Sequence, residues 1–248
     1  MKLLSYSNKG SRESNQDLLL ECKLKNGSYL FLIVDGMGGL EHGEMAARLV
    51  CENIETYLST VDHVSPFQIQ MAINKSNLII RQRSEALRVS MGATLGGVAV
   101  QGEEVIYFWV GDVKIIHFRD SRIIFESKSH NLVNELIDSG NIGTVAQLER
   151  YRHVVTRSIH GKTKSGLAEI HSNLFNPNRD ILFVCSDGFH DVLSGIQIES
   201  QLESHESLTD FAVNINEVAG NYCLDNGSFG IVTSGSFCYP ISSLKQYS

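Results

Sequence analysis

Four aspartates stand where a hydrophobic stretch of the chain gives way to a turn. They lie in four short segments: Asn15-Gln16-Asp17, Asp35-Gly36, Ser186-Asp187-Gly188 and Asp225-Asn226. Small or turn-forming neighbours let the backbone turn sharply, so that side chains and carbonyls can point to one place. Carboxylate oxygens are hard ligands, which suit Mg²⁺ or Mn²⁺ better than Zn²⁺. The pattern therefore predicts a divalent metal site built from Asp17, Asp35, Asp187 and Asp225.

A cluster of carboxylates of this kind indicates hydrolysis of a phosphoester. Several like charges tolerate one another only where cations neutralise them. Two ions about 3.5–4 Å apart can share a water, lower its pKa toward about 7 and direct the hydroxide at phosphorus. They also neutralise charge on the transferring phosphoryl oxygens. Arg12 precedes Asp17 by five residues, and its planar guanidinium can bind two phosphate oxygens at once.

Composition excludes several other classes of protein. The chain has 248 residues, 42% of them hydrophobic, and a formal net charge of -7. We expect one domain over residues 1–248 that is soluble, cytoplasmic and monomeric. Clustered Lys and Arg are absent from the sequence, which argues against partners such as nucleic acid or a membrane surface. The five cysteines share no CxxC spacing, so neither a zinc site nor a disulfide framework is indicated.

Helical periodicity is clear in three parts of the sequence. Apolar residues recur at helical spacing from Gly43 to Ser59. Ser65-Pro66 then provides an N-cap and a first-turn proline for a second helix that runs to about Leu87. A further helix is expected from Ser207 to Asn221. Residues 127–165 are polar and less regular, with short helical patterns at Leu132–Ser139 and Val145–Tyr151, and we expect a flap there.

The β-rich runs are short and are separated by turn residues. They are Leu18–Leu24, Tyr29–Val34, Ala93–Val100, Val105–Val110, Lys114–Arg119, Arg122–Phe125, Ile181–Cys185 and Phe229–Thr233. Asn26-Gly27 between the first two runs is typical of a tight hairpin turn. The four runs between residues 93 and 125 indicate an antiparallel meander. Strands in sets and helices in pairs favour an α+β layered sandwich over a doubly wound sheet.

Taken in order, the polar motifs resemble those of the metal-dependent serine/threonine phosphatases of the PP2C (PPM) type in bacterial style. The motifs are Arg12-Glu13-Ser14-Asn15-Gln16-Asp17, Asp35-Gly36-Met37-Gly38-Gly39 followed by Gly43-Glu44, Gly92-Ala93-Thr94, Gly111-Asp112, Ser186-Asp187-Gly188 with Asp191, and Asp225-Asn226. The resemblance extends from about residue 5 to residue 234. It implies a four-layer α-β-β-α sandwich with two central, mostly antiparallel sheets and metals in a cleft at one end.

The resemblance also implies a role for each residue. Asp35 bridges two Mg²⁺ or Mn²⁺ ions, one completed by the Gly36 carbonyl and water. Asp187 and Asp225 hold the other ion, and Asp17 contacts the cluster mostly through water. In family members a third, weaker ion is held by the residues that match Asp112 and Asp191, and Arg12 matches the arginine that orients the substrate phosphate. The implied enzyme is a phosphoprotein phosphatase that opposes a Ser/Thr kinase.

The sequence departs from the family pattern at several positions. Gly-Asp-Ser-Arg is replaced by Gly111-Asp112-Val113-Lys114, and Asp-His by Ser129-His130. These changes keep open a second hypothesis, a catalytically weak domain that binds phosphorylated partners as a regulatory module. Hydrolysis of a small phosphoester is a third, which an open, shallow cleft would oppose. Met37 stands where eukaryotic relatives have a histidine proposed to protonate the leaving group.

Histidine and tryptophan side chains give weaker signals. His42, His130 and His153 have the right intrinsic pKa for acid-base chemistry, but each is interpreted as a loop or surface histidine. Trp109 lies in a β-rich run and is interpreted as a core or sheet residue, not a stacking platform.

Overall fold

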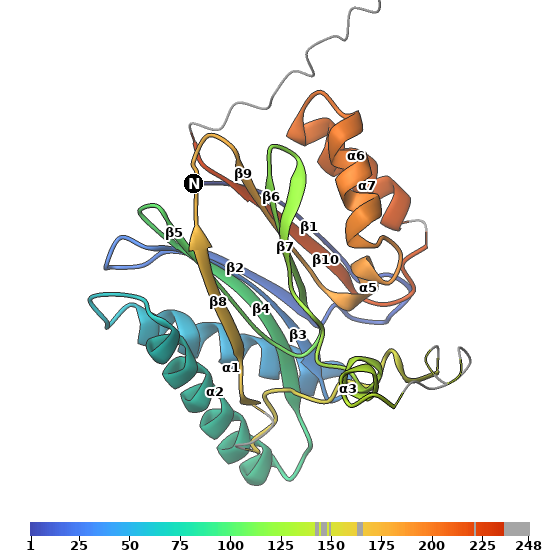
Figure 1. Cartoon of the computed structure of the whole chain (residues 1–248). Helices are drawn as coiled ribbons and strands as arrows, with labels where there is room; N and C mark the ends of the chain where they lie inside the picture. The colour runs from blue at the N-terminus through green and yellow to red at the C-terminus, as the bar shows by residue number, and fades with distance from the viewer. Residues whose placement is uncertain (142–143, 145–147, 149, 163–165, 221, 236–248) are drawn as a thin grey trace, which may run out of the picture.

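Two five-stranded antiparallel sheets lie face to face at the centre of the molecule (Figure 1). The computed structural model describes residues 1–141, 144, 148, 150–162, 166–220 and 222–235. The first sheet has the order β1 (Lys2–Asn8), β10 (Gly227–Thr233), β9 (Asp180–Cys185), β6 (Lys114–Arg119) and β7 (Arg122–Glu126). The second has the order β2 (Asp17–Lys23), β3 (Tyr29–Met37), β4 (Gly92–Gln101), β5 (Glu104–Val110) and β8 (Glu169–Leu174). The expected pair of antiparallel sheets is confirmed.

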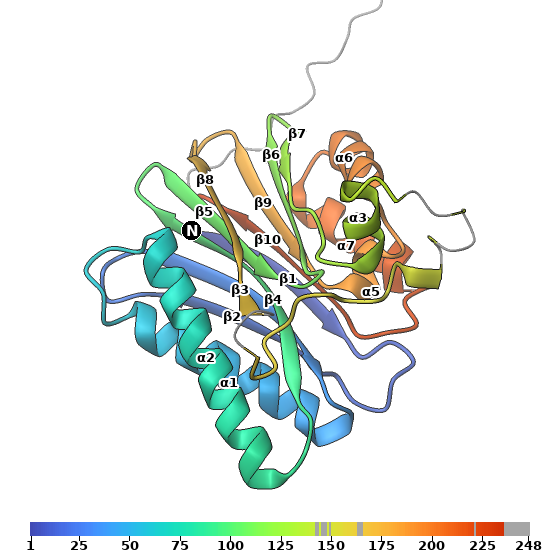
Figure 2. The same cartoon turned by 60° about the horizontal axis from the view of Figure 1, so that its bottom comes forward.

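Helices cover the outer face of each sheet (Figure 2). The second sheet is covered by α1 (Leu40–Leu58) and α2 (Pro66–Leu87), and the first by α6 (Gly195–Ser204) and α7 (Leu208–Gly220). Two short helices, α3 (Leu132–Asp138) and α5 (Asp187–His190), follow β7 and β9 in the chain. The order of the layers is therefore α-β-β-α, as predicted. No helix within the described ranges is long and apolar enough to cross a membrane.

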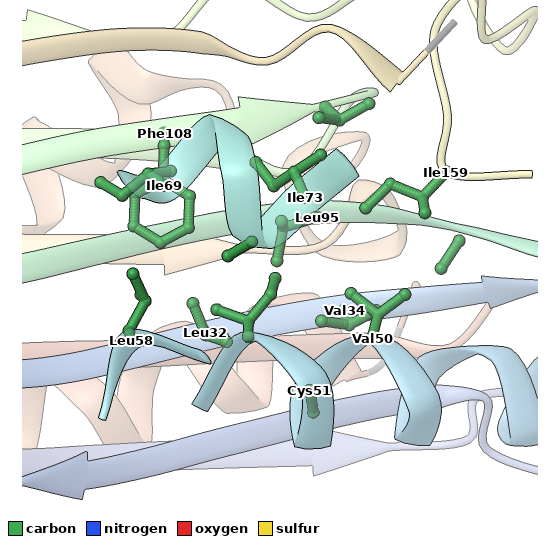
Figure 3. Close-up of a cluster of buried hydrophobic side chains, with 14 of the residues drawn as sticks. Leu32, Val34, Val50, Cys51, Leu58, Ile69, Ile73, Leu95, Phe108 and Ile159 are labelled. Carbon is green, nitrogen blue, oxygen red and sulfur yellow. The ribbon is translucent and has the colours of Figure 1, made fainter. Parts of the chain in front are cut away.

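Hydrophobic side chains fill the space between every pair of layers. Between α1, α2 and the second sheet, Leu32 and Val34 of β3 pack against Val50 of α1 and Ile73 of α2 (Figure 3). Between the sheets, Trp109 is only 1% exposed, which confirms it as a core residue. A third cluster joins the first sheet to α6 and α7. Burial on both faces makes the central strands nearly continuous apolar runs.

Local sequence signals explain the best-predicted elements. The Ser65 hydroxyl accepts a hydrogen bond from the Gln68 amide and caps α2, with Pro66 at the first helical position. Gly27, with φ of +88°, allows the turn between β2 and β3. The helix expected at 132–139 is α3, and that expected at 207–221 is α7. Residues 145–147 and 149 of the helical pattern expected at 145–151 lie outside the described residues, as do residues 142–143 and 163–165 of the proposed flap.

The predicted single meander over residues 93–125 is wrong. β4 pairs with β5 in the second sheet, whereas β6 pairs with β7 and β9 in the first sheet. The chain crosses between sheets at Gly111, whose φ of +105° is unfavourable for residues with a side chain. A Cβ there would lie 2.4 Å from Thr94 Cγ2. The turn therefore redirects the chain, and the four runs form two hairpins in different sheets.

Four elements were not predicted from the sequence: β1, β8, α5 and α6. The strands β1 and β8 form sheet edges, paired with β10 and β5 respectively. Neither carries the nearly continuous apolar run of a central strand, because edge strands are partly exposed. The α6 helix has a capping box at Ser194 and Gln197, a local signal that was present in the sequence.

A buried ionic network lies at the end of the sandwich where β6 ends and β9 begins. Asp180 is fully buried, and both its oxygens accept hydrogen bonds from Arg119, each 2.8 Å long. His117 Nε2 lies 3.0 Å from Asp180 Oδ2, and the Asn176 amide donates to the same oxygen over 2.7 Å. Tyr107 Oη lies 2.5 Å from His117 Nδ1. Burial alone would raise the pKa of Asp180, but these hydrogen bonds hold it well below its ordinary value.

Candidate active site

Acidic residues from both sheets line one cleft of about 500 Å³ at the opposite end of the sandwich. The lining includes Asp35, Gly36, Asp112, Asp187, Asp225 and Arg12. These residues lie where β3, β5 and β9 end and just before β10 begins. Strand ends that meet at the same edge bring together side chains that are far apart in the sequence. Most of the predicted site is therefore assembled in one place.

Asp17 lies behind the cleft lining and is 8% exposed. It stands directly opposite Asp35 in the pairing of β2 with β3. Its Oδ2 accepts a 2.8 Å hydrogen bond from Ser186 Oγ, while its buried Oδ1 has no hydrogen-bond partner within the described residues. A buried carboxylate oxygen without a donor is costly. Its environment therefore suits a cation or an ordered water.

The Gly36 position depends on close backbone packing. Its amide donates to the Gln16 carbonyl over 3.1 Å, which joins the start of β2 to the end of β3. A Cβ at residue 36 would lie 2.1 Å from the Gly43 carbonyl oxygen of α1. Only glycine allows α1 to approach this turn so closely. A side chain at residue 43 would meet a different neighbour, because its Cβ would lie 2.7 Å from Cδ of the Gln16 side chain.

Asp187 and Asp225 are held by local hydrogen bonds. Asp187 lies at the start of α5, and its Oδ1 accepts a 2.6 Å bond from the Gly188 amide. Asp225 Oδ1 accepts from the Asn226 amide over 2.7 Å. The other oxygen of Asp225 pairs with Arg12 Nη2 at 2.6 Å. The arginine side chain is thus anchored beside the acids, on the rim of the cleft.

Asp112 and Asp191 occupy different positions relative to the cleft. Asp112 is 5% exposed and lines it, whereas Asp191 is not among the lining residues. Asp191 contacts His153, which does line the cleft, with 3.2 Å between Oδ2 and Nδ1. His190 Nε2 lies 2.9 Å from the Asp112 carbonyl oxygen. Only Asp112 of this pair therefore faces the cleft directly.

The electrostatics of the cleft favour binding of positive charge. Burial raises the pKa of Asp17 and of Asp112 to about 6, with repulsion from neighbouring carboxylates adding to the effect. Burial and the same repulsion raise the pKa of Asp35 and Asp187 well above the ordinary value. Each carboxyl resists ionisation because its neighbours are also acids. A divalent cation would relieve both the repulsion and the loss of solvation.

The protein ligands of such a cation are not a closed cage. No three His, Cys, Asp or Glu side chains converge on one point closely enough to hold a metal ion in the part of the chain that the structure describes. Carbonyl oxygens, such as that of Gly36, and water would have to complete the coordination. Mg²⁺ commonly binds in this way, with few carboxylates and several waters. The donor set therefore fits a hydrated, oxygen-bound ion.

Comparison with known proteins agrees with this geometry. The family model described as Protein phosphatase 2C matches residues 6–223. The chain belongs to the protein phosphatase 2C family. It is therefore a protein serine/threonine phosphatase that acts on phosphoproteins and depends on metal ions. The relation to the phosphatases that was expected from the motifs is confirmed.

Individual relatives cover nearly the whole chain. Protein phosphatase PhpP of Streptococcus pneumoniae is 26% identical over 230 residues, which are 90% of this chain and 92% of PhpP. The structure of the serine/threonine phosphatase of S. agalactiae is 25% identical, with a TM-score of 0.83, covering 94% of this chain and 99% of that one. A structure of the catalytic domain of PstP in complex with two manganese ions is 22% identical, with a TM-score of 0.75, and covers 93% and 96%.

In this protein phosphatase 2C, the structure identifies two cleft residues whose roles were not predicted. His153 was interpreted as a loop or surface residue, and its side chain is 55% exposed, but it lines the cleft. Asn226 was noted only as part of a motif. Its side chain accepts from the Gln16 amide and donates to the Lys9 and Ser14 carbonyls, so it holds the loop that carries Arg12. The position of Asn226 directly after Asp225 in the motif is the sequence signal for this role.

Removing metal from this phosphatase should lower its thermal stability, most strongly near neutral pH. Because the folded-state pKa of Asp17 and Asp112 is about 6, against 3.8 ordinarily, the metal-free protein loses stability as pH rises from about 4 to above 6. Bound metal offsets that loss, by about 2.7 kcal/mol at a hundredfold excess over Kd. Calorimetry at pH 7.5 with chelator in place of Mn²⁺ should show Tm lower by roughly 5–10 °C.

The same comparison at pH 5 should show a smaller difference in Tm, because protons then compete with metal for the carboxylates. Sodium chloride at the ionic strength of the manganese chloride, without the metal, is the control for screening. Equal Tm with metal and with chelator at pH 7.5 would contradict the assignment of these acids to a metal site.

Proposed function

We propose that this phosphatase removes phosphate from phosphoserine and phosphothreonine at the acidic cleft, and that it thereby opposes a Ser/Thr kinase. The observation that carries the proposal is the convergence of buried aspartates from both sheets on a cleft with an arginine at its rim. In this proposal Asp35, the Gly36 carbonyl, Asp187 and Asp225 hold two Mg²⁺ or Mn²⁺ ions, and Asp17 supports them. Asp112 and Asp191 serve a third, weaker ion.

When bound, the ions supply an activated water as nucleophile and neutralise charge on the phosphoryl oxygens. The protein contributes position and a fixed field. Asp17 is hydrogen-bonded to Ser186, and this bond fixes one oxygen, while the other is buried without a hydrogen-bond donor among the described residues. The Gly188 and Asn226 amides fix one oxygen each of Asp187 and Asp225. These bonds orient the acids before substrate arrives, which reduces reorganisation during the reaction.

Arg12 is assigned to the substrate phosphate. Its side chain is 61% exposed and pairs with Asp225 through one guanidinium nitrogen only. A guanidinium has five donors, so the remaining nitrogens can bind phosphate oxygens. The loop that carries it is fixed by Asn226 and by the bond from Ser11 Oγ to the Leu224 carbonyl. The hydrogen bonds of its loop and the ion pair with Asp225 therefore hold Arg12 beside the acids.

The open rim of the cleft supports a protein substrate. The side chains of Arg12 and Asp225 are 61% and 41% exposed, so the reacting centre is accessible to a residue on a protein surface. A small phosphoester is usually enclosed far more completely by its pocket. This difference favours phosphoproteins over small metabolites.

The deciding experiment measures phosphate release from a phosphothreonine peptide with Mn²⁺, with Mg²⁺ and with chelator. We expect turnover with either metal and a rate at least about a hundredfold lower with chelator, since the ions contribute several kcal/mol to the transition state. The rate with p-nitrophenyl phosphate serves as a comparison for small phosphoesters. A protein that binds metal and phosphopeptide but releases no phosphate would instead be a regulatory binding domain.

A further inference from the structure

His130 makes an unusual number of contacts for a loop residue. It follows β7 and precedes α3, and it lies in a loop as expected, but it is only 6% exposed. Its amide donates to the Gly111 carbonyl over 2.8 Å. Its ring Nδ1 accepts from the Gly111 amide over 3.1 Å. Both polar groups of the Gly111 backbone are thus satisfied by one residue.

The contact with Gly111 fixes the protonation of the ring. Because Nδ1 accepts a hydrogen bond, the proton of the neutral imidazole lies on Nε2. That nitrogen lies 3.2 Å from Oε2 of Glu169 on β8, which can accept the proton. Burial lowers the pKa of His130, and Arg157, 3.4 Å from the same nitrogen, acts in the same direction. The ring is therefore neutral in the fold, with a defined tautomer.

Gly111 immediately precedes the cleft acid Asp112. Gly111 has a φ of +105° and no side chain, so only hydrogen bonds to its backbone can hold the turn between the sheets. The orientation of Asp112 therefore depends on what holds the backbone of its neighbour. The His130 amide and ring together provide two such bonds.

The opposite side of His130 contacts a second wall of the cleft. Its carbonyl accepts a 2.9 Å bond from the Thr156 amide, and the Leu132 amide donates to the Val154 carbonyl over 2.9 Å. Between these two bonds, Val155 lines the cleft, as does the nearby His153. His130 thus stands between the turn that carries Asp112 and the segment that forms the facing wall.

We propose that His130 is a positioning residue: it sets the Gly111-Asp112 turn and couples that turn to the wall formed by residues 153–156. The expected effect of His130 on kcat rests on the proposed function. Glu169 holds the ring in place from β8, the edge strand beside β5 (Figure 1). A shift of the wall would then be transmitted to Asp112 through His130, whose carbonyl bonds to the wall and whose amide and ring bond to Gly111.

Two substitutions separate the bonds of the ring. In His130→Asn, the amide oxygen takes the place of Nδ1 and can still accept from Gly111, but the contact with Glu169 is lost. In His130→Gln, the longer side chain can reach Glu169 but offers no acceptor at the Nδ1 position. The proposal expects His130→Gln to lower kcat about 10- to 100-fold, as is typical for residues that support metal ligands. His130→Asn should stay within about threefold of wild type.

His171 provides a matched control. Its ring lies 5.6 Å from Trp109 at 16°, and that of His130 lies 6.0 Å away at 20°. His171 Nε2 also lies 3.1 Å from Glu169, on the other oxygen. Within the described residues, the His171 ring bonds to Glu169 and makes no hydrogen bond to Gly111. His171→Asn should therefore leave kcat, and the exchange rate of the Gly111 amide, at the wild-type values.

Two readouts do not depend on turnover. In the ¹⁵N-labelled protein, hydrogen exchange at the Gly111 amide should be at least about tenfold faster in His130→Gln and unchanged in His130→Asn. Trp109 is the only tryptophan, and its indole donates to the Lys128 carbonyl in the same loop. Its emission should shift on addition of Mn²⁺ in the wild type and in His130→Asn, but less in His130→Gln.

Several results would overturn the proposal. These are unchanged Gly111 exchange in His130→Gln, equal loss of kcat in the Asn and Gln variants, or a loss in His171→Asn as large as in His130→Gln. If His130→Gln does not fold, the ¹⁵N chemical shifts of the His130 ring in the wild type test the proposal instead. A protonated Nδ1 could not accept the bond from the Gly111 amide and would overturn the proposal. An inactive wild type with the expected exchange pattern would refute the proposed function and not this arrangement.

Discussion

Replacing Asp35 by Asn should lower the metal-dependent kcat on a phosphothreonine peptide at least about a thousandfold. In the proposed function Asp35 bridges the two ions, so its loss removes several kcal/mol of transition-state stabilisation, and each 1.36 kcal/mol is a factor of ten in rate. The substitution keeps the shape of the side chain and removes a carboxylate whose own pKa is raised well above its ordinary value by burial and by repulsion from Asp17 and Asp187. The metal-free variant should therefore be as stable as the wild type, or more so.

The control for this prediction is Asp120→Asn. Asp120 is an exposed aspartate that pairs with Arg179 in the turn after β6, one strand length away from Asp112. Its removal should change kcat by less than about twofold, because an exposed ion pair contributes little. Activity in Asp35→Asn within tenfold of the wild type, measured by phosphate release with Mn²⁺, would rule out Asp35 as the bridging ligand.

Replacing Asp180 by Ala should destabilise the fold by about 2–4 kcal/mol without altering the chemistry of the cleft. Breaking a buried ion pair typically costs about 3–5 kcal/mol, and the 28% exposure of Arg119 reduces this because water can solvate the arginine. The substitution also leaves the Asn176 amide without its acceptor. Denaturant unfolding at pH 7 measures the effect, and kcat of the folded variant should remain near that of the wild type.

The pH dependence gives this prediction a second check. The pKa of Asp180 in the fold lies below the ordinary 3.8, so its contribution is present above pH 4 and is lost as pH falls further. The difference in unfolding free energy between wild type and variant should therefore shrink below pH 4. Asp120→Ala, which breaks the adjacent but exposed pair with Arg179, should cost less than about 1 kcal/mol. Equal losses in the two variants would contradict the role of burial.

Much of the fold was predictable because its signals are local. Ser65-Pro66 begins α2 through a hydroxyl cap and a fixed φ, both of which depend only on neighbouring residues. The turn at Gly27 depends in the same way on the freedom of one glycine. The crossing at Gly111 was missed because a turn between strands has the same local signal whether the strands pair or separate. Pairing is decided by packing against distant residues.

The edge strands show the same limit. β1 pairs only with β10, and its residues alternate weakly between exposed and half-buried positions. A strand whose stability comes from a partner more than 200 residues away carries little periodicity of its own. The central strand β4 is buried almost throughout and was correctly predicted.

For the site, the sequence by itself determined which acids stand at strand ends and in which order the motifs follow. It was enough to place Asp17, Asp35, Asp187 and Asp225 in a phosphatase of this family, because ligand chemistry is a property of residue type and turn geometry. The pairing of the strands and the packing of the two sheets decided that Asp35, Asp187 and Asp225 line one cleft, with Asp17 behind it.

Only the tertiary structure decided the supporting contacts. It brought His130 into hydrogen-bond contact with Gly111 and Asn226 into contact with the loop that carries Arg12, and it buried Asp180 in a network with Arg119. Each of these contacts joins residues at least 19 positions apart. Hydrogen bonds at such separations depend on how the strands of the two sheets align. The packing of the whole core sets that alignment, whereas the composition of a short segment sets only the local turn.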